Sequence, residues 1–245
     1  MRIQEYRYLG NSKYNIVING SDYVLYEDII LKYNLLTKDN INDSEIAKYI
    51  EENKMYDAYY IALKYIKIKL RTRKEIELYL SKKDYSDFDI DYAIARLEQE
   101  KYLDERMYAK SYILDAINLK NTGPHKIIME LTNLGIDRNI VSEELSMFTD
   151  DLMMEKVSKY IEKSIKNNHN KSSYILKNKI KQNLINLGYD ANIINECFEK
   201  YDLDDNEIYK IELEKAKNKL SRKYTGKELD YKIKEYMYRK GFKVE

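Results

Sequence analysis

The sequence contains few of the residues that form disulfides, membrane spans or export signals. Cys197 is the one cysteine in 245 residues, so no disulfide can form within the chain. No apolar run reaches the roughly 18 residues that a membrane span needs, and none resembles a signal peptide. We therefore expect a cytoplasmic protein without a membrane segment.

Groups for catalysis and ligand binding are equally scarce. The two histidines, His125 and His169, and the single cysteine show no zinc-site spacing and no evident nucleophile–base set. The seven glycines form neither a G-x-x-x-x-G-K-[ST] nor a G-x-G-x-x-G motif, which disfavours nucleotide binding. These absences predict a protein that is not an enzyme and that needs no cofactor or metal.

Charge is abundant but balanced. Charged residues make up 35% of the chain and the net charge is +1, so the overall charge does not select nucleic acid as a partner. Faces of one sign could still do so. The single proline leaves long segments free to form helix.

What the sequence does contain is an internal repeat. Gly135, Gly188 and Gly241 are spaced at equal intervals of 53 residues, each after an amphipathic stretch, and the same alignment places Asp84 in an earlier copy. A residue just past a helix often needs the left-handed conformation, which glycine reaches without a Cβ clash and aspartate tolerates. We assign all four as helix-end residues. Valine at Gly135 or Gly188 should cost about 1 to 2 kcal/mol.

Helix-start signals divide each copy into three helices. Thr72 and Glu75 form the S/T-x-x-E capping box, and Ser86 or Asp87 can cap the following helix. Pro124 occupies a position where a first-turn proline is tolerated.

The predicted fold is mainly α: tandem three-helix repeats forming an elongated, curved array after a small N-terminal β-meander with helices. Alternating apolar residues around Asn19-Gly20, and an earlier turn at residues 10–12, predict the meander. Helical spacing follows at residues 27–35 and 43–53. The expected divisions are a leader at 1–55, repeats at 56–101, 102–149 and 150–203, and a partial fourth repeat of two helices at 204–245.

Four segments carry a family resemblance: RKEIELYLSKK at 73–83, YLDERMYA at 102–109, GPHKI at 123–127 and LTNLGI at 131–136. In this order and spacing they resemble the RecX family, bacterial modulators of the RecA recombinase, over roughly residues 57 to 200. The leader and the partial fourth repeat resemble the longer form of that family. Glu105 replaces a frequent Asp and Tyr108 a frequent Phe.

The resemblance implies a non-enzymatic protein that lies along the helical groove of the RecA filament on DNA. It also implies suppression of ATP hydrolysis and strand exchange, and so modulation of recombination, DNA repair and the SOS response. We expect a monomer, because the truncated fourth copy and the charged ends offer no self-complementary apolar surface.

The most concentrated charge is the candidate partner-binding surface. We call it the basic run: Lys64, Lys67, Lys69, Arg71, Arg73, Lys74, Lys82 and Lys83. It could contact acidic RecA loops or DNA phosphate, and the structural alternative is a solvated helix face whose lysine stems cover apolar surface. Reversing Arg71, Arg73 and Lys74 to glutamate should keep helicity and weaken the interaction several-fold.

Two functions stay open from the residues alone. One is regulation of the RecA filament, and the other is direct binding of nucleic acid through basic helix faces, independent of RecA. A second basic stretch, from Lys159 to Lys181, contains seven lysines and one acid, Glu162. It is less distinctive, because lysine and asparagine are common throughout the chain.

Overall fold

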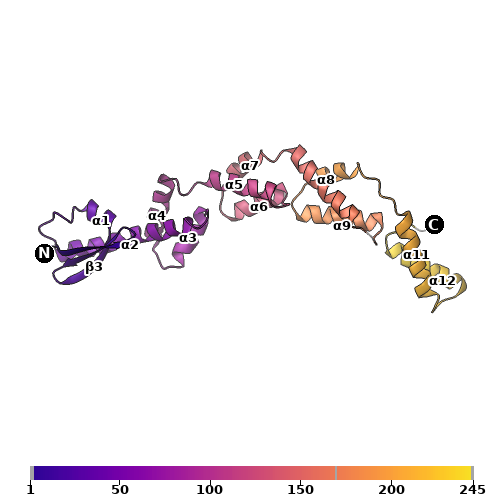
Figure 1. Ribbon diagram of the computed structural model, residues 1–245, viewed down its shortest axis with the longest axis horizontal. Helices are drawn as coiled ribbons and strands as arrows, with labels where there is room; N and C mark the ends of the chain where they lie inside the picture. The colour runs from indigo at the N-terminus through magenta and orange to yellow at the C-terminus, as the bar shows by residue number, and fades with distance from the viewer. Residues whose placement is uncertain (1–2, 169, 244–245) are drawn as a thin grey trace. The chain divides into compact units, whose positions relative to one another are not determined.

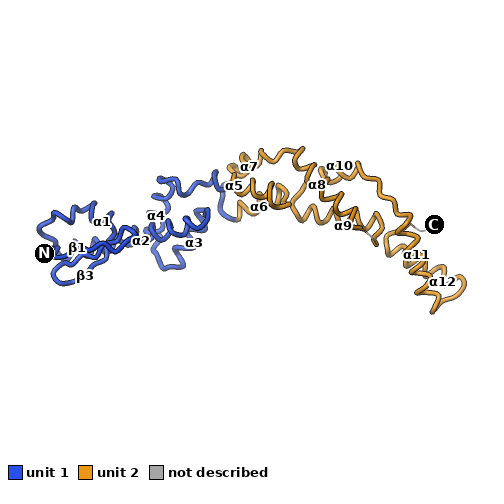
Figure 2. Tube along the Cα trace, in the orientation of Figure 1, with its two compact units in different colours: residues 1–108, 134–137 blue, residues 109–133, 138–245 orange. Residues whose placement is uncertain are grey.

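The computed structural model describes residues 3–168 and 170–243. Within these residues the protein is mainly helical, and one small antiparallel sheet precedes the helices (Figure 1). The chain divides into two compact units (Figure 2). The first unit consists of Met1–Tyr108 and Leu134–Asp137, and the second of Ala109–Asn133 and Arg138–Glu245.

The predicted β-meander is confirmed. Strands β1 (Ile3–Gly10), β2 (Lys13–Ile18) and β3 (Ser21–Tyr26) form a sheet in the order β1-β2-β3, with both neighbouring pairs antiparallel. Asn19 and Gly20 connect the last two strands with φ angles of 51° and 78°. Positive φ at both central residues matches the twist of a two-residue hairpin, which explains the Asn-Gly pair.

One long helix joins the leader to the first repeat. Helix α1 (Glu27–Lys32) ends three residues before the predicted end, whereas α2 (Asp43–Ile66) continues past the predicted end at residue 53. No glycine or proline occurs between its ends, so nothing in the sequence breaks this helix. The expected boundary between residues 55 and 56 therefore falls inside α2.

The remaining helices are grouped here by the expected divisions of the chain. The first repeat uses the second half of α2 with α3 (Arg73–Ser81) and α4 (Asp87–Gln99). The second contains α5 (Glu105–Asn118), α6 (Pro124–Asn133) and α7 (Arg138–Leu145). The third contains α8 (Asp150–Lys166), α9 (Ser173–Asn186) and α10 (Ala191–Phe198). Two helices complete the described chain: α11 (Asn206–Leu220) and α12 (Gly226–Arg239).

The predicted capping residues lie where the helices begin. Thr72 and Glu75 form the reciprocal capping box of α3, and Ser86 accepts a hydrogen bond from a backbone N–H in the first turn of α4. Pro124 is the first residue of α6, as predicted. Local sequence therefore determines where these helices start.

The predicted helix-end residues all adopt the left-handed conformation. The φ angles are 64° at Asp84, 89° at Gly135, 92° at Gly188 and 80° at Gly241. Besides ending a helix, each of the three glycines lies against the start of the second helix in the preceding repeat. An added Cβ would be 3.0 Å from the Cβ of Lys74 at Gly135, 2.5 Å from the backbone nitrogen of Lys126 at Gly188, and 2.6 Å from Ser172 Oγ at Gly241.

The turn at Gly188 shows the effect of this close contact between a glycine turn and the start of a helix. The backbone N–H of Gly123 donates to the carbonyl of Leu187 at 2.7 Å, and that of His125 donates to the carbonyl of Gly188 at 3.0 Å. The first N–H groups of a helix have no partner inside it. Here the backbone N–H groups at the start of α6 donate to carbonyls in the turn of the next repeat. Asp84 is exposed, so its side chain is accommodated in the first copy.

Asp57, in the middle of α2, ties the sheet to the first repeat. Its carboxylate accepts hydrogen bonds from Lys13 Nζ at 3.0 Å and from the Tyr26 hydroxyl at 2.6 Å, both on the sheet. A third bond comes from the hydroxyl of Tyr85, beyond the end of α3. Burial alone would raise the pKa of Asp57, but these hydrogen bonds outweigh it and hold the pKa below its ordinary value.

This lowered pKa predicts an acid sensitivity of the junction. An unfolded aspartate has a pKa of about 3.9, so its proton binds more tightly in the unfolded than in the folded chain. The stabilisation is therefore complete above that value and is lost as the pH falls through it towards the folded pKa. Between pH 5 and pH 3 the wild type should lose more unfolding free energy than Asp57→Asn, measured by urea denaturation. Equal losses in both proteins would contradict the assignment.

Candidate functional site

The basic run lies on the first repeat. Lys64 is in the last turn of α2, the residues from Lys67 to Arg71 form the loop before α3, and Arg73 and Lys74 open that helix. Lys82 and Lys83 follow its end. One helix–loop–helix segment thus carries all eight residues.

Glu75 organises the centre of this segment. It closes the capping box with Thr72, accepts a hydrogen bond from Arg71 Nη1 at 3.1 Å, and lies 4.0 Å from Lys69 Nζ. Arg73 is paired as well, with Glu77 at 3.0 Å and Glu98 at 3.2 Å. Neighbouring carboxylates therefore balance part of the positive charge of residues 64–74, which contain no acid in the sequence.

Arg71 differs from the rest of the basic run because its side chain is only 11% exposed. Its guanidinium carbon lies 3.7 Å from the ring centroid of Tyr65, which stacks on Tyr79 at 4.0 Å. This packing gives Arg71 a structural role in fixing the loop. Reversing its charge would place a carboxylate against Glu75, so a variant designed to test binding should leave Arg71 intact.

Three lysines of the basic run are exposed and unpaired among the described residues. Lys64, Lys67 and Lys82 are exposed, and within residues 3–168 and 170–243 none of them has an ion pair or a hydrogen-bonded side chain. Ile68 and Leu70, in the same loop, are 76% and 39% exposed. Exposed ammonium groups beside exposed apolar side chains suit an acidic protein surface or a nucleic-acid backbone.

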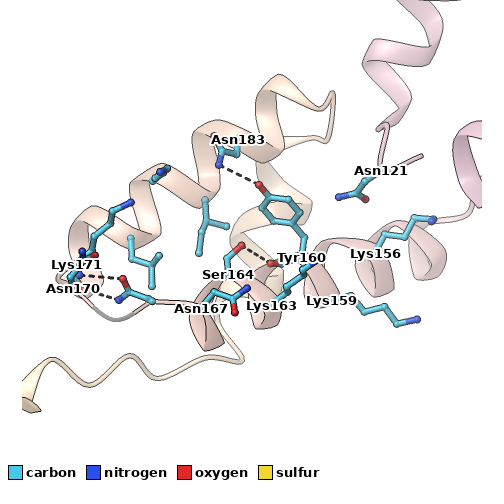
Figure 3. Close-up of a pocket in the computed structure, with 14 residues that line it drawn as sticks. Asn121, Lys156, Lys159, Tyr160, Lys163, Ser164, Asn167, Asn170, Lys171 and Asn183 are labelled. Carbon is cyan, nitrogen blue, oxygen red and sulfur yellow. Dashed lines mark hydrogen bonds between the residues drawn. The ribbon is translucent and has the colours of Figure 1, made fainter. Parts of the chain in front are cut away.

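The second basic stretch forms a groove that sequence reasoning did not single out. The groove has a volume of about 680 Å³ and lies between α8 and α9 (Figure 3). Lysines one to two turns apart on α8 are the sequence signal that could have revealed it, since residues at that spacing share a helix face. No group of metal-binding side chains occurs in the described residues, and His169 lies outside them.

No helix among the described residues is long and apolar enough to cross a membrane.

Comparison with known proteins identifies the family. Residues 58–97 match the model of the first three-helix domain of RecX. Regulatory protein RecX of Oceanobacillus iheyensis is 27% identical, over 96% of this chain and 90% of that protein. Its counterpart from Halalkalibacterium halodurans is 29% identical, over 96% and 92%.

Solved structures agree with these matches. A crystal structure of a regulatory protein RecX has a TM-score of 0.72 at 22% identity, covering 81% of this chain and 100% of that one, which shows a common fold. RecX from Lactobacillus salivarius has a TM-score of 0.58 at 32% identity, covering 61% and 97%. With this identity over nearly all of the Lactobacillus chain, and with the matched first domain, the chain belongs to the RecX family of regulatory proteins.

Proposed function

We propose that this protein binds the RecA filament on DNA and inhibits its ATP hydrolysis and strand exchange, without being an enzyme itself. The observation that carries the proposal is the match to regulatory RecX proteins over 96% of the chain. The protein would act in the cytoplasm as a monomer and modulate recombination, DNA repair and the SOS response.

The tandem repeats support this kind of partner. Similar helical units in a row present similar surfaces at regular intervals along the chain, and a RecA filament also repeats. Once one unit is bound, the next binds at a high effective concentration, so several modest contacts add up to a strong interaction.

Within the first repeat, the exposed part of the basic run is the proposed contact surface. Lys64, Lys67 and Lys82 provide charge that no neighbouring carboxylate balances in the described chain. Arg71 holds the loop in place through Tyr65 and Glu75. It therefore positions the proposed contact surface without being part of it.

The test of function is ATP hydrolysis by the cognate RecA on single-stranded DNA, titrated with this protein. We expect hydrolysis to be inhibited at molar ratios well below one molecule of this protein per RecA, because each bound molecule affects many subunits of the filament. Undiminished hydrolysis at every ratio would contradict regulation of RecA.

The contact surface is tested with Lys64→Glu, Lys67→Glu and Lys82→Glu combined. We expect the concentration for half-inhibition to rise roughly tenfold, because attraction to an acidic surface becomes repulsion. The control combines Lys200→Glu, Lys210→Glu and Lys227→Glu, three exposed lysines of the third and fourth repeats with the same total change of charge. If both variants inhibit RecA as the wild type does, the contact lies elsewhere.

Direct binding of nucleic acid remains a second candidate function. The groove between α8 and α9 favours it, because its lining is rich in lysine and contains no carboxylate among the described residues.

A further inference from the structure

The groove between α8 and α9 combines positive charge with amide groups. Its charged lining consists of Lys156, Lys159, Lys163, Lys171 and Lys179. Five asparagines, one serine and Tyr160 supply the remaining polar groups, and no carboxylate of the described chain lines it. A surface of this composition attracts anions and offers them hydrogen-bond donors.

Two acids of α8, Glu155 and Glu162, do not line the groove. Glu155 pairs with Lys159 one turn away on α8, and Glu162 accepts a hydrogen bond from the Tyr201 hydroxyl at 3.0 Å. This leaves four lysines, Lys156, Lys163, Lys171 and Lys179, without an ion pair in the part of the chain that the structure describes. In a protein with a net charge of only +1, such a cluster is a local excess of positive charge.

Two of these lysines are held next to each other. The neighbouring Lys179 lowers the pKa of Lys171 below its ordinary value, because two positive charges close together repel. The loop fixes the backbone at Lys171, because Asn168 Nδ2 donates to the Lys171 carbonyl at 2.7 Å and the Lys171 N–H donates to Asn168 Oδ1 at 3.1 Å. A bound anion would relieve the repulsion between the two ammonium groups.

The groove also has features suited to a base. Tyr160 lies between α8 and α9, where its hydroxyl accepts a hydrogen bond from Asn183 Nδ2 at 3.2 Å (Figure 3). Leu176 and Ile180 add apolar surface, and Asn121 adds another amide. An aromatic ring and amide groups beside a basic surface are a combination found where proteins bind single-stranded nucleic acid.

Size decides which nucleic acid fits. Lys156 and Lys163 lie on the same face of α8 with a rise of about 10 Å between them, enough for neighbouring phosphates of one strand. The volume of about 680 Å³ is that of a small-molecule site, which holds one or two nucleotides and not a duplex. We propose that the α8–α9 groove binds single-stranded nucleic acid through its phosphodiester backbone, independently of RecA.

The test measures binding of a fluorescent oligothymidine by anisotropy, without RecA, at several salt concentrations. The groove variant combines Lys163→Glu, Lys171→Glu and Lys179→Glu. We expect its dissociation constant to rise about tenfold or more, and the slope of log affinity against log salt to fall in magnitude by about 2, since each contact on a single strand contributes roughly 0.7. The Lys200, Lys210 and Lys227 control should keep the wild-type slope.

Circular dichroism and thermal unfolding check that the groove variant is folded, and the matching Lys→Gln variant provides a second test without introducing negative charge. The proposal is overturned if the groove variants bind with wild-type affinity and slope, or if the wild type does not bind at low salt. Tighter binding of a duplex of the same length would overturn the choice of a single strand. Because RecA is absent, these outcomes are separate from those of the ATP hydrolysis assay.

Discussion

Replacing Gly188 with alanine should lower the free energy of unfolding of the second unit by about 3 kcal/mol. The left-handed conformation accounts for about 1 to 2 kcal/mol, and overpacking adds a similar amount. The new Cβ would lie 2.5 Å from the backbone nitrogen of Lys126, which cannot move aside without shifting α6. Urea denaturation followed by circular dichroism measures the loss.

Gly10→Ala is the matched control for this substitution. Gly10 has nearly the same φ, 89° against 92° at Gly188, but a Cβ there would meet no atom within 4 Å. The control should therefore cost only the conformational part, about 1 to 2 kcal/mol. Amide exchange of His125 provides a local readout, because its N–H donates to the Gly188 carbonyl and should lose protection only in the Gly188 variant. Equal costs in both variants would show that the close approach contributes nothing.

Replacing Asp57 with alanine should cost the first unit about 3 kcal/mol. Lys13, Tyr26 and Tyr85 would lose their common acceptor, and a hydrogen bond to a charged group contributes about 1.5 to 3 kcal/mol. Water would replace part of the loss at Lys13, whose side chain is 37% exposed. The measurement is urea denaturation at neutral pH.

Glu51→Ala provides the control on the same helix. Glu51 also pairs with a lysine, Lys54 at 2.9 Å, but its side chain is 75% exposed, whereas that of Asp57 is 29% exposed. An exposed pair contributes about 0 to 1 kcal/mol, so this variant should stay close to the wild type. If Asp57→Ala were equally mild, the sheet would not be held to the first repeat through this carboxylate.

Sequence reasoning predicted features that depend on neighbours along the chain. Thr72 with Glu75 and Ser86 cap helices as expected, and the Asn19-Gly20 hairpin is present. Each signal lies within a few residues of the structure that it specifies. The glycine interval likewise predicted the left-handed helix ends and the repeat.

Features that depend on distant residues were not predictable in the same way. Nothing in the sequence near Asp57 shows that Lys13, Tyr26 and Tyr85 converge on it. The burial of Arg71 against Tyr65 likewise depends on how the loop folds back onto α2. The basic run therefore looked uniform in sequence, although its members differ in exposure and pairing. The second basic stretch was visible in the sequence, but the groove that it forms was not, because the groove's lining comes from two helices, a loop and Asn121.

The glycine turns also set an order in which the chain can assemble during synthesis. The turn at Gly188 contacts the start of α6 and the turn at Gly241 contacts the start of α9, so each turn docks on a segment that left the ribosome earlier. Each repeat can therefore pack against a preceding repeat that has already been synthesised, and its turn then contacts the start of the second helix there. At Gly226, where α12 begins, a Cβ would meet no atom of the described chain within 4 Å, so no such turn lies against that residue.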